Sequence, residues 1–302
     1  MNATPPDIIF IPGIRPKPPA DQQAFELSRC LRFALEKSSG VAVDASKLAA
    51  QLEVIGWSWH FYGIHKDVES DRAGIEELLQ GLANPSQMEK EAASFGRKLG
   101  SFLYDFADHF PRLSAVFATR AMETRMHEVR RYFRNRNDEA HALRKMVIKR
   151  LQLSWSQNRP VILLAHSFGS VIGYDALWEL THLHKNPHKV DLFVSMGSPL
   201  TLKFIRNRIL GARMAGAEQY PHNIIRWLNF AAQGEVTAQG RGMLDCFAEM
   251  QTLGLIESIQ DNLGIINQYR EPDGLNVHKC YGYLACPTIA AEIGAAIGEF
   301  SQ

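Results

Sequence analysis

The chain has 302 residues, of which 46% are hydrophobic and 22% charged, values typical of a globular protein. Its 33 Lys and Arg against 32 Asp and Glu give a formal net charge of +1, which offers no argument for a nucleic-acid partner. No apolar run approaches the roughly 20 residues of a membrane-spanning helix. Four cysteines without a Cys-x-x-Cys pair favour free thiols and give no sign of a zinc site. We therefore expect a cytoplasmic protein.

The chain opens with a predicted strand, loop and helix. The apolar residues 7–11, closed by Pro12 and Gly13, predict a buried strand, and a helix is expected over about 21–37. The β-branched and aromatic residues of 52–59 predict a second strand with Trp57 and Trp59 on the same face. These indoles suit either the core or the wall of a pocket.

Residues 67–157 show only helical periodicity, over a length too great for one crossover between strands. We expect at least three helices there and assign 67–127 to a helical insertion within a single domain spanning 1–302. The middle helix carries an apolar stripe that includes Phe102 and Phe106. Such a stripe suits the core or a channel for an apolar substrate, so Trp59, Phe102 and Phe106 are the candidate pocket residues.

The second half of the chain alternates predicted strands and helices. Strands are expected over 160–165, 190–195 and 223–230, and helices over about 169–184 and 287–300. This rhythm predicts an α/β fold with a mostly parallel central sheet flanked by helices.

The most informative segment is 161–173, where an apolar strand leads into Ala165-His-Ser-Phe-Gly169 and then directly into a helix. Small residues two before and two after a serine at a sharp strand-to-helix turn are typical of a nucleophile elbow. This turn would present the Ser167 hydroxyl at the C-terminal edge of the sheet, beside a helix N-terminus that favours a developing oxyanion. The simpler alternative is that Ser167 caps the helix.

Ala165-His-Ser-Phe-Gly169 resembles the Gly-x-Ser-x-Gly motif of the α/β-hydrolase superfamily, with Ala in place of the first Gly. Residues 8–14 resemble the early strand and His-Gly turn of that superfamily, with Pro12 in place of His. Residues 195–199 and 227–230, followed by a late histidine, resemble lipase-like serine hydrolases. The likeness covers about 6–62 and 128–300 and leaves the insertion unmatched. It implies a serine hydrolase that requires no metal or organic cofactor.

In this superfamily the acid and then the histidine follow the serine along the chain. His278, in a loop before the last helix, is the candidate base, because the other histidines after the elbow lie at a helix end or before a strand. The acid is expected after the strand 223–230, where Glu235 is the first candidate and Asp245 and Asp261 are rivals.

The oxyanion hole would use main-chain N–H groups of Phe168 and of Gly13 or Ile14. The resulting hypothesis is a hydrolase that cleaves a small-molecule carboxylic ester, acyl or lipid-like, through an acyl-enzyme on Ser167. A thioesterase or acyltransferase would share every residue named. A binding module with a defective triad is the third alternative.

Overall fold

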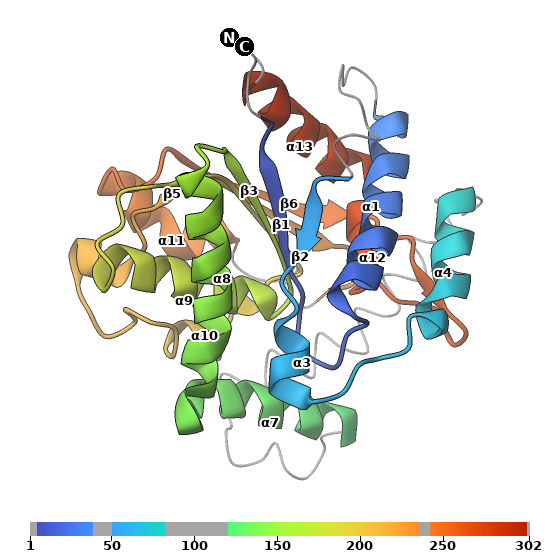
Figure 1. Ribbon diagram of the computed structural model, residues 1–302, viewed down its shortest axis with the longest axis horizontal. Coiled ribbons are helices and arrows are strands. Elements are labelled where there is room, and N and C mark those ends of the chain that lie inside the picture. Colours follow the sequence, from blue (N-terminus) through green and yellow to red (C-terminus); the bar gives the residue numbers. More distant parts are fainter. Residues whose placement is uncertain (1–4, 39–49, 82–119, 236–241, 301–302) are drawn as a thin grey trace.

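The computed structural model describes residues 5–38, 50–81, 120–235 and 242–300. Its centre is a six-stranded sheet in the order β2-β1-β3-β4-β5-β6, in which every neighbouring pair is parallel (Figure 1). The strands are β1 (Asp7–Ile11), β2 (Leu52–Val54), β3 (Val161–His166), β4 (Val190–Met196), β5 (Ile224–Ala232) and β6 (Ser258–Ile265). The predicted α/β fold with a mostly parallel sheet is confirmed.

Helices cover both faces of the sheet and make three layers (Figure 1). One face carries α1 (Ala20–Lys37), α4 (Glu69–Gln80), α12 (Cys280–Leu284) and α13 (Pro287–Phe300). The other face carries α3 (Trp57–Tyr62), α7 (Arg120–Arg134), α8 (Glu139–Ser156), α9 (Gly169–His182), α10 (Lys203–Arg206) and α11 (Met243–Thr252). A short hairpin, β7 (Arg270–Glu271) and β8 (Gly274–Leu275), precedes α12.

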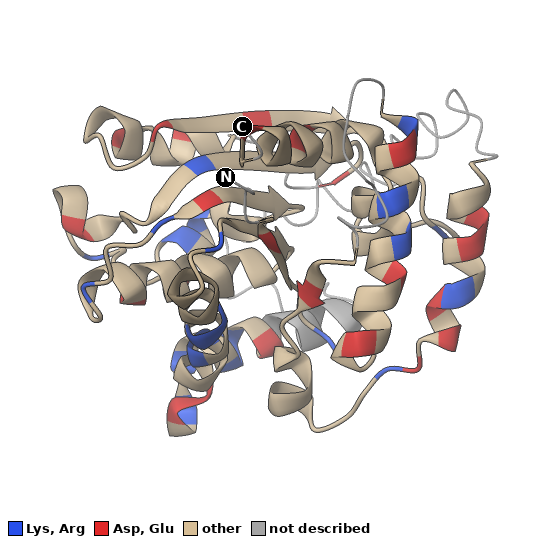
Figure 2. Cartoon of the chain, turned by 45° about the horizontal axis from the view of Figure 1, so that its top comes forward, with Lys and Arg blue, Asp and Glu red and all other residues tan. Residues whose placement is uncertain are grey.

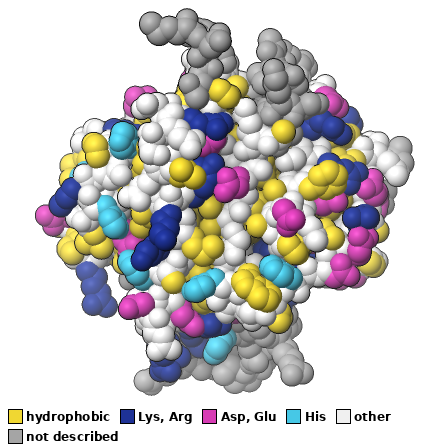
Figure 3. All heavy atoms as spheres, in the orientation of Figure 1, with side chains coloured by type: hydrophobic (Ala, Val, Ile, Leu, Met, Phe, Trp, Pro, Cys, Tyr) yellow, Lys and Arg dark blue, Asp and Glu magenta, His cyan; other side chains and the backbone are white. Residues whose placement is uncertain are grey.

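Alternation along the central strands sends neighbouring side chains into the two helical layers. In β3, Ile162 and Leu164 belong to the core on one face, and Leu163 and Ala165 to the core on the other. Because both faces are covered, the central strands are apolar runs, and the charged residues lie mainly on the surrounding helices and loops (Figure 2). Basic and acidic side chains are interspersed over the face seen in Figure 3.

The second predicted strand is shorter than expected. Pairing with β1 stops at Phe10↔Val54, next to Pro12, and residues 57–62 form α3 instead of continuing the strand. Trp57 is buried and its indole N–H donates to the Pro12 carbonyl at 2.8 Å, whereas Trp59 is 51% exposed. The expectation that the two indoles share one face of a strand is therefore wrong.

The sheet ends in a strand that the sequence did not predict. Among the described strands β6 pairs only with β5 and forms the edge of the sheet, and its polar residues give no apolar run to recognise.

The segment 67–127 is described only at its two ends, by α4 and by the beginning of α7. α4 packs against α1, and its Ile75 and Leu78 join the core beneath. Phe102 and Phe106, the predicted pocket residues of the middle helix, lie outside the described residues. No helix of the described part is both long and apolar enough to cross a membrane.

Candidate active site

The candidate site lies at the carboxyl edge of the sheet, where the order of the strands reverses. β1 has β2 on one side and β3 on the other, so the loops after β1 and β3 leave in neighbouring positions. Gly13 follows β1, Ser167 follows β3 and Glu235 follows β5 closely. Parallel strands thus bring together residues more than 200 positions apart.

Ser167 adopts the strained backbone that an elbow requires. Its φ is +53°, in the left-handed region that costs a non-glycine residue about 1–3 kcal/mol. Two hydrogen bonds hold the turn: the Ser167 N–H donates to the Met196 carbonyl at 2.8 Å, and the Ser170 hydroxyl donates to the Ser167 carbonyl at 2.6 Å. These contacts with the neighbouring strand and the following helix hold the strained backbone in place, and this fixes the direction of the Ser167 side chain.

The two glycines around the elbow are required by close packing. A Cβ at Gly169 would lie 2.6 Å from the Pro12 carbonyl oxygen, and a Cβ at Gly13 would lie 2.8 Å from the Cβ of Ser167. Both distances are below any ordinary contact, so the loop after β1 and the elbow can approach each other only with glycine at these positions.

The structure places the three predicted residues in one chain of hydrogen bonds. His278 Nε2 lies 2.9 Å from Ser167 Oγ, and His278 Nδ1 lies 3.0 Å from Glu235 Oε1. A carboxylate can only accept, so Nδ1 carries the proton and Nε2 is free to accept from the serine hydroxyl. The Glu235 side chain is 4% exposed and that of His278 38%, so the carboxylate is buried while the imidazole reaches the surface.

Tyr283 of α12 lies beside the buried carboxylate of Glu235. Its hydroxyl accepts a hydrogen bond from the Ala232 N–H at 3.1 Å. Burial first, and then the negative charge of Glu235, raises the pKa of Tyr283 well above its usual range. Tyr283 therefore stays protonated and its hydroxyl can donate to Glu235, a contact that sequence reasoning missed.

Gly197, which follows β4, forms the floor beneath the Glu235 and His278 pair. Its φ is +56°, and a Cβ there would lie 2.9 Å from Glu235 Oε2 and 3.1 Å from His278 Nδ1. The imidazole and carboxylate can meet at their observed distance only because this position has no side chain. Sequence reasoning noted the segment Ser195-Met-Gly-Ser-Pro199 but gave Gly197 no role.

The rival acids have other partners. Asp261 lies on β6 and accepts hydrogen bonds from the N–H groups of Met243 and Leu244 at the start of α11, at 2.8 and 2.9 Å. Asp245 accepts from the Gly242 N–H at 3.1 Å. Both carboxylates thus stabilise the N-terminus of α11, and neither is hydrogen-bonded to His278.

The predicted oxyanion donors are the main-chain N–H groups of Phe168 and of Gly13 or Ile14. Within the described ranges, none of these N–H groups has a hydrogen-bond acceptor. The loop after β1 is fixed by its carbonyls: the Trp57 indole binds that of Pro12, and the Lys17 ammonium binds that of Ile14 at 2.7 Å. Burial lowers the pKa of Lys17 to about 8. The N–H groups of Gly13 and Ile14 therefore belong to a loop that these hydrogen bonds hold in place.

His166 supports the histidine loop from below. Its Nε2 lies 2.8 Å from the main-chain carbonyl of His278, which makes Nε2 the donor and His166 the Nε2–H tautomer. Burial, with His278 and Lys17 nearby, holds the pKa of His166 well below its ordinary range, so the ring is neutral. His166 thus positions the main chain of His278.

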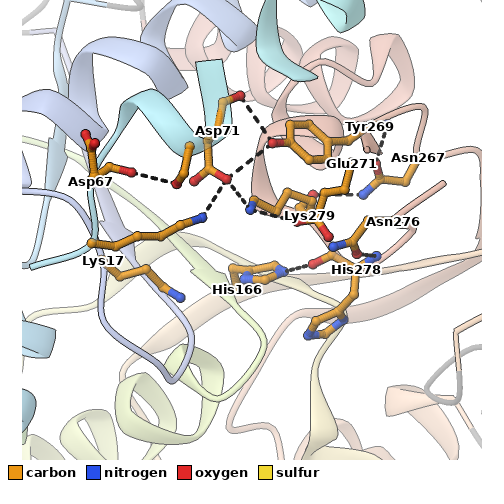
Figure 4. A network of polar contacts seen from close by, with 12 residues as sticks. Lys17, Asp67, Asp71, His166, Asn267, Tyr269, Glu271, Asn276, His278 and Lys279 are labelled. Carbon is orange, nitrogen blue, oxygen red and sulfur yellow. Dashed lines mark hydrogen bonds and ion pairs between the residues drawn. The ribbon is translucent and has the colours of Figure 1, made fainter. Parts of the chain in front are cut away.

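A buried carboxylate anchors the residue after His278 (Figure 4). Asp71 of α4 lies 2.5 Å from the Lys279 ammonium and 2.7 Å from that of Lys66, and it also accepts from the Tyr269 hydroxyl. Burial alone would raise the pKa of Asp71, but the two ammonium groups lower it below its usual value. This network ties α4 to the loop that carries the candidate base.

The remaining pocket prediction concerns Trp59. Its indole stacks on His65 with ring centroids 4.5 Å apart on the outer side of α3. No hydrogen bond or ring contact joins Trp59 to the Ser167 site in the described ranges. Among these residues there is also no group of three His, Cys, Asp or Glu side chains placed to hold a metal ion.

Comparisons with models of protein families, with curated proteins and with solved structures gave no match for this chain.

Proposed function

We propose that the protein is a serine hydrolase of the α/β-hydrolase superfamily that cleaves a carboxylic ester through an acyl-enzyme on Ser167. The observation that carries the proposal is the unbroken chain from Ser167 Oγ to His278 to buried Glu235, beside main-chain N–H groups that have no acceptor among the described residues. A serine that only capped a helix would need neither an imidazole at 2.9 Å nor a carboxylate behind it.

In the first half-reaction His278 Nε2 removes the proton of Ser167 as Oγ attacks the ester carbonyl carbon. The carbonyl π electrons move to oxygen, and the N–H groups of Phe168 and of Gly13 or Ile14 stabilise that oxyanion. Glu235 keeps the imidazole in the correct tautomer and stabilises its cation without taking the proton. When the tetrahedral intermediate collapses, the C–O bond breaks and His278 protonates the leaving alcohol.

In the second half-reaction water takes the place of the alcohol. His278 removes a proton from the water, whose oxygen attacks the acyl carbon at Ser167. The second tetrahedral intermediate releases the acid, and the proton on His278 returns to Ser167 Oγ. In this scheme Ser167, His278 and Glu235 act in both halves of the cycle.

An acyl or lipid-like ester is the proposed substrate, because a partly exposed aromatic side chain lies near the elbow: the Phe133 ring packs 6.0 Å from that of Phe168. We also place the activity in the cytoplasm, since the four cysteines form no disulfide and three of them are buried thiols.

Labelling with a fluorophosphonate probe tests the proposal without a known substrate. The wild-type protein should be labelled at Ser167, as mapped by mass spectrometry, and Ser167→Ala and His278→Ala should not be labelled. His184→Ala removes an exposed histidine away from the site and should label like the wild type. A folded wild-type protein that resists the probe would contradict the proposal and favour the binding module.

Rates measured on an oxygen ester and on the thioester with the same acyl group then distinguish an esterase from a thioesterase or an acyltransferase. We expect the oxygen ester to be hydrolysed at a rate comparable to the thioester. A thioester hydrolysed far faster, or an acyl group passed to an added alcohol instead of water, would replace the esterase by a thioesterase or an acyltransferase on the same triad.

A further inference from the structure

A groove of about 630 Å³ lies between the C-terminal half of α7 and the loop that follows α10. Its described lining contains four arginines and no acid: Arg130 and Arg134 come from α7, and Arg208 and Arg213 from the loop. All four side chains are exposed, and none forms an ion pair with a carboxylate in the described part of the chain. We call this site the arginine groove.

Two arginines close to the groove do pair with carboxylates, and the chain as a whole is nearly neutral. Arg131, next to Arg130 on the same helix, pairs with Glu139, and Arg144 pairs with Glu179. Arg130 and Arg134 stand one helical turn apart, so their like charges repel each other without a counter-charge. Four guanidinium groups that have no carboxylate partner among the described residues, placed around one concavity, are suited to a ligand with at least two negative charges.

Buried contacts hold both walls of the arginine groove in place. Asp175 of α9 is 1% exposed and accepts one hydrogen bond from the Tyr132 hydroxyl of α7 and one from the Leu210 N–H of the loop, both at 2.8 Å. The Arg208 guanidinium lies 3.9 Å from the centre of the Phe204 ring and donates to the Phe204 carbonyl at 2.9 Å. The groove is therefore formed before any ligand arrives, which lowers the entropic cost of binding.

The arginine groove adjoins the elbow. Phe133 lines the groove, and its ring packs 6.0 Å from that of Phe168, the residue after Ser167. Phe204 also lines it and stands on α10, just beyond the carboxyl end of β4. Phe133 therefore connects the lining of the groove to the residue that follows Ser167.

We propose that the arginine groove binds the phosphate group of a phosphate-bearing acyl ester, whose ester bond is then presented to Ser167. A terminal phosphate supplies the two negative charges and three acceptor oxygens that guanidinium groups bind in pairs. Phe133 and Phe204, the aromatic side chains of the lining, would contact the acyl part. The cleavage step rests on the proposed function, whereas binding of the phosphate does not.

Calorimetry on the Ser167→Ala protein tests binding apart from chemistry. The probe is dihexanoyl phosphatidate, a soluble phosphate monoester with two acyl chains, and dihexanoyl glycerol is its neutral counterpart. Replacing Arg134→Gln and Arg208→Gln together should weaken phosphatidate binding at least tenfold and leave binding of the neutral diester unchanged. Arg136→Gln with Lys145→Gln removes the same charge from exposed positions outside the groove and should change neither.

The outcomes separate the groove from the serine chemistry. Equal weakening in the two double variants, or tighter binding of single-stranded DNA than of phosphatidate, would overturn the groove as a phosphate-ester site. Binding only to vesicles of long-chain phosphatidate would indicate that the arginine groove docks on a membrane, and this result would also overturn the proposal. Groove-dependent binding with no hydrolysis of phosphatidate by the wild type would refute the substrate assignment, and fluorophosphonate labelling would show whether the serine chemistry fails as well.

Discussion

Replacing Gly197 by alanine should damage the candidate site, because the added Cβ would crowd both the Glu235 carboxylate and the His278 imidazole. Alanine at φ +56° costs about 1–2 kcal/mol of stability, because an L side chain is strained in the left-handed region. The new Cβ would also lie 2.9 Å from Glu235 Oε2 and 3.1 Å from His278 Nδ1, where ordinary contacts begin at 3.4 Å. The carboxylate and the imidazole must therefore give way by a few tenths of an ångström each.

That displacement acts on the bond that orients the base. The Nδ1 to Oε1 distance is 3.0 Å, near the long end of a charge-assisted hydrogen bond, so further separation weakens it steeply. A misplacement of about 1 Å can cost a hundredfold in rate, and half of that distance about tenfold. We expect the rate constant for fluorophosphonate labelling of Ser167 to fall about ten- to a hundredfold in Gly197→Ala.

Gly216→Ala is the matched control. Its φ is +57°, but a Cβ there meets nothing within 4 Å. Urea unfolding should show both variants losing about 1–2 kcal/mol, whereas labelling should slow only in Gly197→Ala. Equal labelling rates in the two variants would refute the steric argument, since the strain common to both would then explain everything measured.

Four further substitutions test Glu235, its exposed rival Asp245, and the buried carboxylates of Asp175 and Asp71. Glu235→Gln should slow labelling of Ser167 by about a thousandfold or more, because an amide neither fixes the tautomer of His278 nor stabilises the imidazolium. Asp245→Asn should be labelled like the wild type. Slow labelling of Asp245→Asn together with normal labelling of Glu235→Gln would instead identify Asp245 as the acid. Burial raises the pKa of Asp175 to about 6. The contribution of Asp175 to the free energy of unfolding is therefore fully present below about pH 4 and is lost as the pH rises through 6. In urea titrations, the free energy of unfolding of Asp175→Asn should therefore rise by up to about 3 kcal/mol relative to that of the wild type as the pH goes from 4 to 7. A difference in unfolding free energy between the two proteins that does not change with pH would count against a raised pKa. Asp71 has a lowered pKa, so its stabilisation is present above about pH 4 and is lost on acidification. Asp71→Asn should cost about 3 kcal/mol at pH 7 and less at pH 3, and a loss of stability that grew on acidification would contradict the ion pairs.

Local patterns in the sequence predict much of the site. The elbow is a contiguous motif with small residues at fixed spacing, and Ser167 has the positive φ that such a turn demands. His278 and Glu235 follow from chain order along a parallel sheet, and the structure places both within hydrogen-bond distance. The roles of these residues in catalysis stay predictions.

Other features depend on contacts between distant parts of the chain, which no local pattern encodes. Gly197 matters because residues 38 and 81 positions later converge on it. Trp57 leaves the predicted strand since its indole binds the Pro12 carbonyl, 45 residues earlier. The polar edge strand β6 has no apolar run, although its Asp261 holds the start of α11.

Both described ends of the segment 67–127 lead to helices that contact the candidate site. At one end, Asp71 of α4 binds Lys279, and so anchors the loop of His278 from outside while His166 holds it from beneath. At the other end, α7 continues to Tyr132, whose ring packs on Phe168 beside Ser167. A loop histidine would otherwise lose its geometry to main-chain motion. These contacts make α4 and α7 part of the framework that holds the candidate base, Ser167 and the candidate oxyanion donors in place, so the two helices support the site as well as cover it.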